Sequence, residues 1–167
     1  FIGSKVYTLI VGKQKKKSLN SITENRKARF NFELTEKYEA GLSLEGWEAK
    51  SIREGKAQIA EAYVLLKGGE AWLIGCHINP LKNSNQEMDP VRSRKLLLNR
   101  KELLEIQKAT QQKGKTCIPT RLLWKNELVK CEIALAVGKK AHDKRQTIKS
   151  RDWDREKAKE LRERTKN

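Results

Sequence analysis

Residues 116–137 read TCIPTRLLWKNELVKCEIALAV and predict a pair of antiparallel β-strands. From Val129 to Val137 every second residue is apolar, which is the period of a strand with one buried face. The preceding stretch, Thr116–Lys125, alternates in the same way, and Asn126-Glu127 supplies the turn between the two strands. We therefore expect the folded core to end in a long β-hairpin.

Shorter strands are expected earlier in the chain. They are predicted at residues 30–34, 38–43, 47–52, 63–67 and 71–78. The first of them rests on apolar Phe30, Phe32 and Leu34, which alternate with polar residues. Gly68-Gly69 separates the last two and predicts a tight hairpin.

Two segments predict helices. Residues 55–62 carry enough alanine and isoleucine for a short helix, and in residues 92–112 apolar residues recur seven positions apart, as at Leu96 and Leu103. Some seven short strands with one substantial helix indicate a mainly β fold with helices, a small closed β-barrel flanked by those helices. The OB-type barrel is the usual form of that size among nucleic-acid-binding proteins, although periodicity does not separate it from another barrel.

Composition limits the partners of the chain. Its 167 residues suit one folded unit with terminal extensions. The formal net charge of +16 predicts a polyanionic partner, and RNA, DNA and an acidic membrane all satisfy that requirement. Three widely spaced cysteines without a C-x-x-C pair argue against a disulfide framework and favour a reducing cytoplasm. No apolar stretch is long enough for a transmembrane helix.

The two ends of the chain differ from its centre. Residues 1–17 form an extension with a basic linker, predicted to be disordered, whose short apolar stretch does not match a signal peptide. The folded unit is expected at residues 18–137. Residues 138–167 hold twelve Lys or Arg and six Asp or Glu, with Ile148, Trp153 and Leu161 as the large apolar side chains. Such a tail should stay mobile until an anionic partner organises it.

Two short motifs resemble ligand or catalytic sites but lack the surroundings that such sites need. Gly114-Lys115-Thr116 lacks the earlier glycine of a phosphate-binding loop and is followed by a strand, so it predicts a turn. Cys76 and His77 are neighbours on a strand and point to opposite faces, so they cannot share one metal ion or one proton. We expect no catalytic site, no metal and no cofactor.

A series of sequence blocks runs from Asn25 to the C-terminal tail. The blocks are NRKAR (25–29), YEAGL (38–42), GWEAKS (46–51), YVLL (63–66), DP (89–90), RKLLLN (94–99), WKN (124–126) and GKKAHDKRQTIKSRDW (138–153). In this order and spacing they resemble the SmpB family of tmRNA-binding proteins. The resemblance covers the chain from Lys15 to its C-terminus and implies an OB-like core.

The resemblance implies an RNA-binding adaptor that acts in trans-translation, the rescue of stalled ribosomes. The core would bind the tRNA-like domain of tmRNA, and the tail would occupy the decoding centre of the 16S rRNA and the mRNA channel. Elongation factor Tu is implied as part of the delivered complex, and we expect a cytoplasmic monomer without a membrane partner. On the residues alone, a generic OB-fold RNA chaperone or ribosomal protein stays open, because its tail would need only charge.

The candidate binding residues form two groups. For tmRNA the resemblance implies Asn25, Arg29, Glu39, Arg94, Lys95 and Leu97. For the ribosome it implies the tail residues Gly138, Lys139, Lys140, His142, Lys144, Arg145, Ile148, Lys149, Arg151 and Trp153. In the tail the glycine would act as a hinge, the cations would bind phosphates, His142 would stack on a base, and Trp153 would lie on a helix formed on binding. Without the resemblance, an ion pair with a nearby Lys or Arg is the simpler interpretation of Glu39.

Two sites depart from the family pattern. Family members often carry His and Tyr where this chain has Phe30 and Phe32, so ring stacking could persist without the hydrogen bonds of those groups. Ser150 stands where Glu is common, which puts a carboxylate role at that position in doubt.

Overall fold

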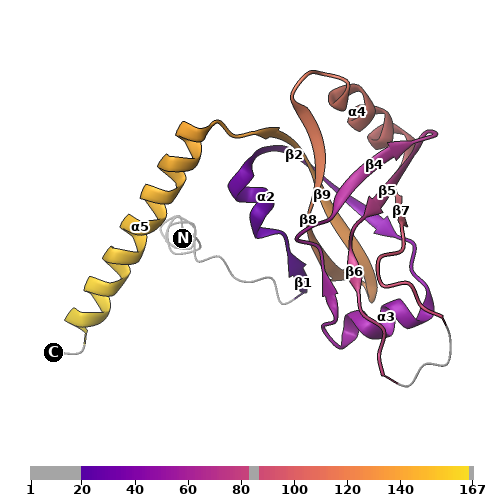
Figure 1. Ribbon diagram of the computed structural model, residues 1–167, viewed down its shortest axis with the longest axis horizontal. Helices are drawn as coiled ribbons and strands as arrows, with labels where there is room; N and C mark the ends of the chain where they lie inside the picture. Colours follow the sequence, from indigo (N-terminus) through magenta and orange to yellow (C-terminus); the bar gives the residue numbers. More distant parts are fainter. Residues whose placement is uncertain (1–19, 83–86, 166–167) are drawn as a thin grey trace, which may run out of the picture.

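The computed structural model describes residues 20–82 and 87–165, and within residues 141–143 it describes the backbone alone. The predicted extension at residues 1–17 lies outside the described residues. The described part is a mainly β structure with four helices (Figure 1). Within the described residues, no helix is long and apolar enough to span a bilayer.

The elements follow one another in a mixed order. They are β1 (Ser21–Glu24), α2 (Arg26–Asn31), β2 (Phe32–Leu42), α3 (Gly46–Arg53), β3 (Ala57–Gln58), β4 (Tyr63–Lys67), β5 (Glu70–Ile74), β6 (His77–Ile78), β7 (Arg94–Leu97), α4 (Arg100–Thr110), β8 (Lys115–Lys125), β9 (Leu128–Gly138) and α5 (Ala141–Arg164). Both predicted hairpins are confirmed, β4–β5 around Gly68-Gly69 and β8–β9 around Asn126-Glu127.

Seven strands form one antiparallel sheet in the order β1-β8-β9-β2-β7-β5-β4, and β3 and β6 form a separate pair. The prediction of a closed barrel is wrong: the sheet curls until β4 lies near β8, but in the described part of the chain no hydrogen-bonded ladder joins its two edge strands. Closure would need a strand that pairs with β8 on one side and with β4 on the other. The four-residue β1, whose register shifts between Ser21 and Thr23, pairs with β8 alone.

The core lies inside this curl. Leu122 of β8, Cys131 and Ile133 of β9, and Leu73 of β5 are fully buried, as the two-residue period requires. Ile106 of α4 is fully buried as well, so this helix covers one end of the curled sheet (Figure 1).

Several predicted segments differ in the structure, and helix caps explain most of the differences. Residues 47–52 form helix α3 rather than a strand, because the Glu48 carboxylate accepts the backbone N–H of Glu45 at 3.0 Å and starts the helix. The segment 92–112, predicted as one helix, divides into strand β7 and helix α4. Helix α4 starts at Arg100 because the Asn99 side chain accepts the backbone N–H of Glu102 at 2.9 Å. Residues 55–62 form a strand and turns instead of a helix, since buried Ala57 and Ile59 alternate with exposed neighbours.

The strand predicted from Phe30 starts later than expected. Asn25 caps a short helix, α2, by accepting the N–H of Ala28 at 3.1 Å, so Phe30 is helical and β2 begins at Phe32. This difference places the Phe30 ring beside the root of the C-terminal tail.

A buried ion network joins α3 to the first residue of β7 and to Arg92 just before it. Arg94 and Glu48 are both fully buried and paired, and a second hydrogen bond links the Arg94 guanidinium to the carbonyl of Cys76 at 2.7 Å. Arg92 also donates to Glu48, through Nε at 3.1 Å. Burial alone raises the pKa of Glu48, but the hydrogen bonds from Arg92, from the Glu45 backbone and from Arg94 outweigh it, so this pKa lies below its ordinary value.

We predict that Glu48→Gln destabilises the fold by about 3–5 kcal/mol, because it leaves the buried Arg94 charge uncompensated. Urea denaturation at pH 7 measures this cost, with Glu54→Gln at the exposed end of α3 as the matched control. A folded-state pKa below the ordinary one adds stability at neutral pH that is lost as the pH falls through the lower value. The stability of Glu48→Gln should therefore fall less between neutral and acid pH than that of the unaltered protein. A loss in the free energy of unfolding below about 1 kcal/mol at pH 7 would contradict the role assigned to the Glu48–Arg94 pair.

Candidate nucleic-acid interface

One face of the curled sheet carries a cluster of charged and exposed side chains. Residues directly opposite each other on paired strands share a face, and the register places Glu39 opposite Glu132, Glu132 opposite Arg121, and Gly41 between Lys130 and Leu97. We call this surface the outer face. It consists of Lys37, Glu39, Gly41, Lys95, Leu97, Arg121, Lys125, Lys130 and Glu132. Their neighbours Ala40, Leu96, Leu122 and Cys131 point into the core.

Glu39 lies near the centre of the outer face and pairs with Lys125 from β8, Oε1 to Nζ, at 2.9 Å. The ion pair expected from the residues alone is thus present. Both side chains are largely exposed, at 39% and 55%, and such surface pairs contribute little stability. The Glu39 carboxylate can therefore exchange its lysine for another hydrogen-bond donor at small cost.

Glu132, opposite Glu39, is held more firmly. Its carboxylate accepts a hydrogen bond from Thr120 Oγ1 at 2.8 Å and pairs with Arg121 at 2.9 Å and Lys37 at 3.5 Å. Burial by itself raises the pKa of Glu132, but the Thr120 hydrogen bond and the charges of Arg121 and Lys37 lower it below the ordinary value. Glu132 therefore stays ionised and holds two of the cations of the outer face in place.

Leu97 is the exposed member of the three successive leucines. Leu96 is buried, Leu98 is half-buried and Leu97 is 54% exposed, so the three do not all face inward. A Cβ atom at Gly41 would lie 3.1 Å from Leu97 Cβ. Because glycine has no side chain, Leu97 can pack directly over the backbone of β2 at this position.

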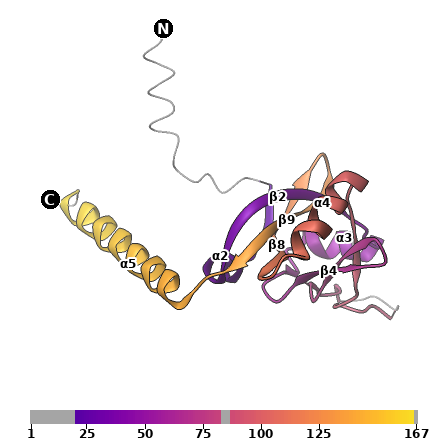
Figure 2. The ribbon, with the colours of Figure 1, turned by 90° about the horizontal axis from the view of Figure 1, so that it is seen from above.

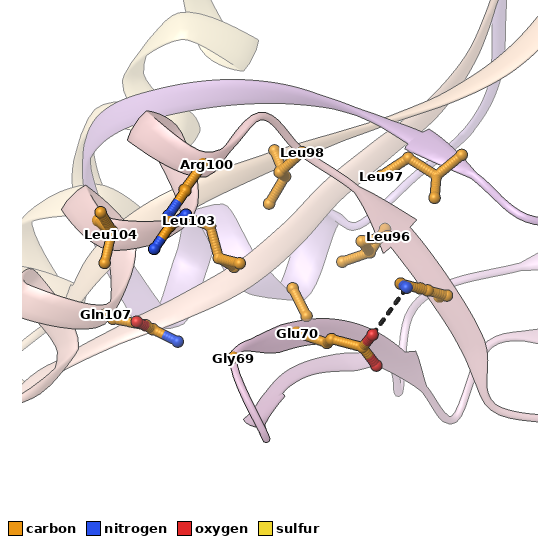
Figure 3. Close-up of a pocket in the computed structure, with 11 residues that line it drawn as sticks. Gly69, Glu70, Leu96, Leu97, Leu98, Arg100, Leu103, Leu104 and Gln107 are labelled. Carbon is orange, nitrogen blue, oxygen red and sulfur yellow. Dashed lines mark hydrogen bonds and ion pairs between the residues drawn. The ribbon is translucent and has the colours of Figure 1, made fainter.

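A hollow of about 560 Å³ lies beside Leu97, between β7, the β4–β5 turn and helix α4 (Figure 3). Leu98, Leu103 and Leu104 contribute apolar side chains, and Arg100 contributes a cation. Lys95 lines the same hollow and pairs with Glu70 at 2.8 Å, as the dashed line in Figure 3 shows. The outer face therefore continues into a groove with apolar walls and charged groups, which can hold a base and its phosphate.

The other predicted tmRNA-binding residues lie elsewhere. Arg94 is fully buried in the Glu48 network, so its guanidinium does not reach a ligand on the surface. Asn25 is 5% exposed, and its side chain accepts from Ala28 N and donates to the Pro119 carbonyl at 3.1 Å. Arg29 is exposed on α2. The structure thus brings together Glu39, Lys95 and Leu97, and assigns Asn25 and Arg94 to the support of the fold.

The C-terminal tail begins where β9 ends. Gly138 pairs with Phe32, the backbone N–H of Lys139 donates to Asn31 at 2.9 Å, and Lys140 precedes helix α5. On α5, Lys144 is half-buried and Arg151 lies over the Phe30 ring. The exposed tail candidates on this helix are Arg145, Ile148, Lys149, Arg151 and Trp153. The side chain of His142 lies outside the described residues, and the mobility of the tail before binding stays a prediction.

The three cysteines lie in the core, and His77 lies at the surface. Cys76, Cys117 and Cys131 are buried and free, and burial raises the pKa of Cys76 to about 11 and that of Cys117 to about 12. The strand predicted at residues 71–78 is interrupted, because β5 ends at Ile74 and Gly75 has a φ of 75°. Buried Cys76 therefore lies between two strands, and exposed His77 begins β6. In residues 20–82 and 87–165 no group of three His, Cys, Asp or Glu side chains could hold a metal ion. Gly114 has φ 81° and lies in the turn before β8, which confirms the turn predicted there.

The sequence did not predict that Lys125, Lys130, Arg121 and Glu132 share the outer face with Glu39. The alternation in residues 116–137 does indicate that these four side chains share the face of the hairpin opposite the core. What it lacked was the position of β2, which precedes β9 by about a hundred residues and brings Glu39 beside Lys125.

The two classes of candidate residue should differ in stability experiments. We predict that Asn25→Ala lowers the free energy of unfolding by about 1 kcal/mol, because it removes the cap of α2 and a bond to β8. Glu39→Ala should change it by less than about 0.5 kcal/mol, because its ion pair is exposed. Thermal denaturation compares the two variants, and equal losses would contradict the division between support and surface.

Known proteins match this chain over most of its length. The SmpB protein family matches residues 22–163. The SsrA-binding protein of Chromohalobacter salexigens is 56% identical over 153 residues, which cover 89% of this chain and 98% of that protein. The SsrA-binding protein of a Psychrobacter species is 54% identical over 149 residues, covering 88% and 94%. A solved chain described as "tmRNA-SmpB: a journey to the center of the bacterial ribosome" is 40% identical, with a TM-score of 0.60, and the match covers 71% of this chain and 84% of that one. The chain belongs to the SmpB family.

Proposed function

We propose that this protein binds tmRNA and brings it to stalled ribosomes for trans-translation. The observation that carries the proposal is the family membership over residues 22–163, together with a 40% identical solved chain described as tmRNA-SmpB in the bacterial ribosome. The protein acts as an RNA-binding adaptor and not as an enzyme, and it works in the cytoplasm, where its ribosomal target is.

The folded core binds the tRNA-like domain of tmRNA through the outer face. The open, curled sheet suits an OB-type platform, a fold that binds nucleic acids on its sheet surface. In this proposal Glu39 releases Lys125 and accepts hydrogen bonds from ribose or base groups, while the freed lysine binds a phosphate. Leu97 packs against a base, with Lys95 beside it. Asn25 and Arg94 act through the fold, and Arg29 contributes a surface cation.

The tail acts on the ribosome. Lys139, Lys140, Lys144, Arg145, Lys149 and Arg151 neutralise phosphates of the 16S rRNA near the decoding centre, and His142 stacks on a base. Ile148 and Trp153 supply apolar contacts along helix α5 in the mRNA channel. Elongation factor Tu joins as part of the delivered complex, and the protein enters it as a monomer.

The core site is tested by the affinity for the isolated tRNA-like domain. We predict that Glu39→Ala weakens binding by about ten- to a hundredfold, because one lost hydrogen bond to a charged group is worth about 1.5–3 kcal/mol. Glu127→Ala, on the exposed turn of the same hairpin that carries Lys125, is the matched control. Equal affinities for the two variants in a filter-binding titration would show that the outer face is not the binding site.

The tail is tested by tagging of stalled nascent chains. Truncation after Val137 should leave binding to the tRNA-like domain nearly unchanged and abolish tagging, because it removes only Gly138 from the sheet, while the tail contacts the ribosome. Trp153→Ala should impair tagging more than any single change among Lys139→Ala, Lys140→Ala and Lys144→Ala, since truncating an indole that packs against the ribosome costs more than removing one of several shared charges.

The order of these effects separates a structured tail from one that needs charge alone. A tail of scrambled sequence and fixed composition should fail in the same tagging assay. If it supports tagging at the full rate, or if Trp153→Ala is milder than every lysine variant, a generic RNA-binding tail is the better account.

A further inference from the structure

Glu132 puts a negative charge on the outer face, where it opposes the approach of a polyanion. A second carboxylate, Glu39, lies directly opposite it on β2, and like charges directly opposite each other destabilise a pair of strands. Glu39 takes part in the proposed RNA contact, whereas Glu132 has no part in it so far. The strands on both sides of Glu132 indicate what this residue does.

Both neighbouring strands are irregular beside Glu132. Its own strand, β9, runs between β2 and β8 (Figures 1 and 2). On β8 the register shifts just before Arg121, where Thr120 is the extra residue, and on β2 it shifts just before Lys37. A bulge bends its strand and redirects the side chains beside it, and Figure 2 shows β2 curving along β9. The two bulges therefore direct one cation from each neighbouring strand toward the same part of β9.

The two cations meet at the Glu132 carboxylate. Arg121 donates through Nε to Oε2 at 3.0 Å, and Lys37 Nζ lies 3.5 Å from Oε1. Thr120 is 1% exposed and donates to Oε1 at 2.8 Å, so this bond is closed to solvent. The side chain of Glu132 is 13% exposed, that of Arg121 28% and that of Lys37 52%. The cations thus stand closer to the solvent than the carboxylate that holds them.

This arrangement suits a phosphate group. Two cations and one carboxylate leave one positive charge, which matches the single negative charge of a backbone phosphate. An ammonium group has three N–H donors and a guanidinium group has five, so each can donate to a carboxylate and a phosphate at the same time. Long side chains that are already ordered lose less conformational entropy when a ligand binds.

We propose that Glu132 is a positioning residue: it holds Lys37 and Arg121 in place, as a pair that binds one backbone phosphate of the RNA on the outer face. Glu132 does not itself contact the RNA, and Thr120 fixes its carboxylate from within the sheet. The inference rests on the proposed function for the identity of that RNA, the tRNA-like domain of tmRNA.

The sign of one charge change tests the proposal in the full-length protein. Glu132→Gln keeps the shape of the side chain and removes a negative charge, so charge alone predicts tighter binding to the isolated tRNA-like domain. Positioning predicts the opposite, a loss of about two- to tenfold, as expected when long side chains must be ordered on binding. Glu127→Gln, on the exposed turn of the same hairpin, changes the net charge equally and should bind no more weakly than the unaltered protein.

A filter-binding titration compares these variants at one salt concentration. An affinity of Glu132→Gln equal to or above that of Glu127→Gln would overturn the proposal.

Two further variants leave Glu132 itself unchanged. Thr120→Val alters no charge and lies out of reach of the RNA, so its expected loss of about twofold must come through the Glu132 carboxylate. Arg121→Gln removes a phosphate contact and should lower the log–log slope of affinity against salt by about 0.7–0.9. The Glu132→Gln/Arg121→Gln double variant should lose less affinity than the two single losses combined, because Glu132 acts partly through Arg121. Fully additive losses would contradict this coupling.

The order of the Arg121 side chain can be measured without any RNA. Nitrogen-15 relaxation at Arg121 Nε should show a rigid side chain in the unaltered protein and in Glu127→Gln, and a mobile one on the picosecond-to-nanosecond timescale in Glu132→Gln. A side chain that is equally mobile in all three proteins would overturn the positioning by Glu132.

An unrelated RNA hairpin of the same length separates this inference from the function on which it rests. If the unaltered protein binds both RNAs equally and Glu132→Gln weakens both, the proposed function fails and the positioning stands. If the unaltered protein prefers the tRNA-like domain but Glu132→Gln binds it as tightly as Glu127→Gln does, the positioning fails and the proposed function stands.

Discussion

The pairing of β2 with β9 is the constraint on which the rest of the structure depends. Because side chains alternate across a strand, this register determines that Ala40 and Cys131 enter the core while Glu39 and Lys130 face outward. A slip by one residue would exchange the two sets and place charges in the core. The same ladder ends with Gly138 opposite Phe32, and so it also determines that the tail leaves the core beside helix α2.

The outer face and the tail use their charges differently from the core. In the interior, Glu48 and Arg94 are paired without access to solvent, and breaking that pair is costly. On the outer face, Glu39–Lys125 and Lys95–Glu70 are exposed pairs whose partners can be exchanged for groups of an RNA. With a net charge of +16, the protein presents more cations than carboxylates to a polyanion. Replacing a carboxylate partner by an RNA phosphate is therefore electrostatically favourable. Buried pairs thus hold the fold, and exposed pairs are available for binding.

Much of the sheet could be predicted from the sequence, since the alternation of apolar residues in 116–137 and the turn residues Gly68-Gly69 indicate local structure. The errors fell where local signals compete. Residues 47–52 have the pattern of a strand, but the carboxylate of Glu48 starts a helix there. In RKLLLN at 94–99, the first four residues form β7 and Asn99 caps helix α4. Burial of Arg94 and its pairing with Glu48 depend on long-range packing that a periodicity cannot show, as does the contact of Phe30 with Arg151. The open edge of the sheet likewise follows from the shortness of β1.

We propose that this one chain carries two separate RNA-binding ends, the outer face of the core and the tail. Cross-linking in living cells, followed by sequencing of the RNA attached to each part of the protein, tests it most directly. The account predicts that cross-links at the outer face, around Lys125 and Lys130, carry tmRNA, and that cross-links in α5 carry 16S rRNA from the decoding region. The same mixture of RNAs on both parts, or tmRNA enriched on neither, would contradict it.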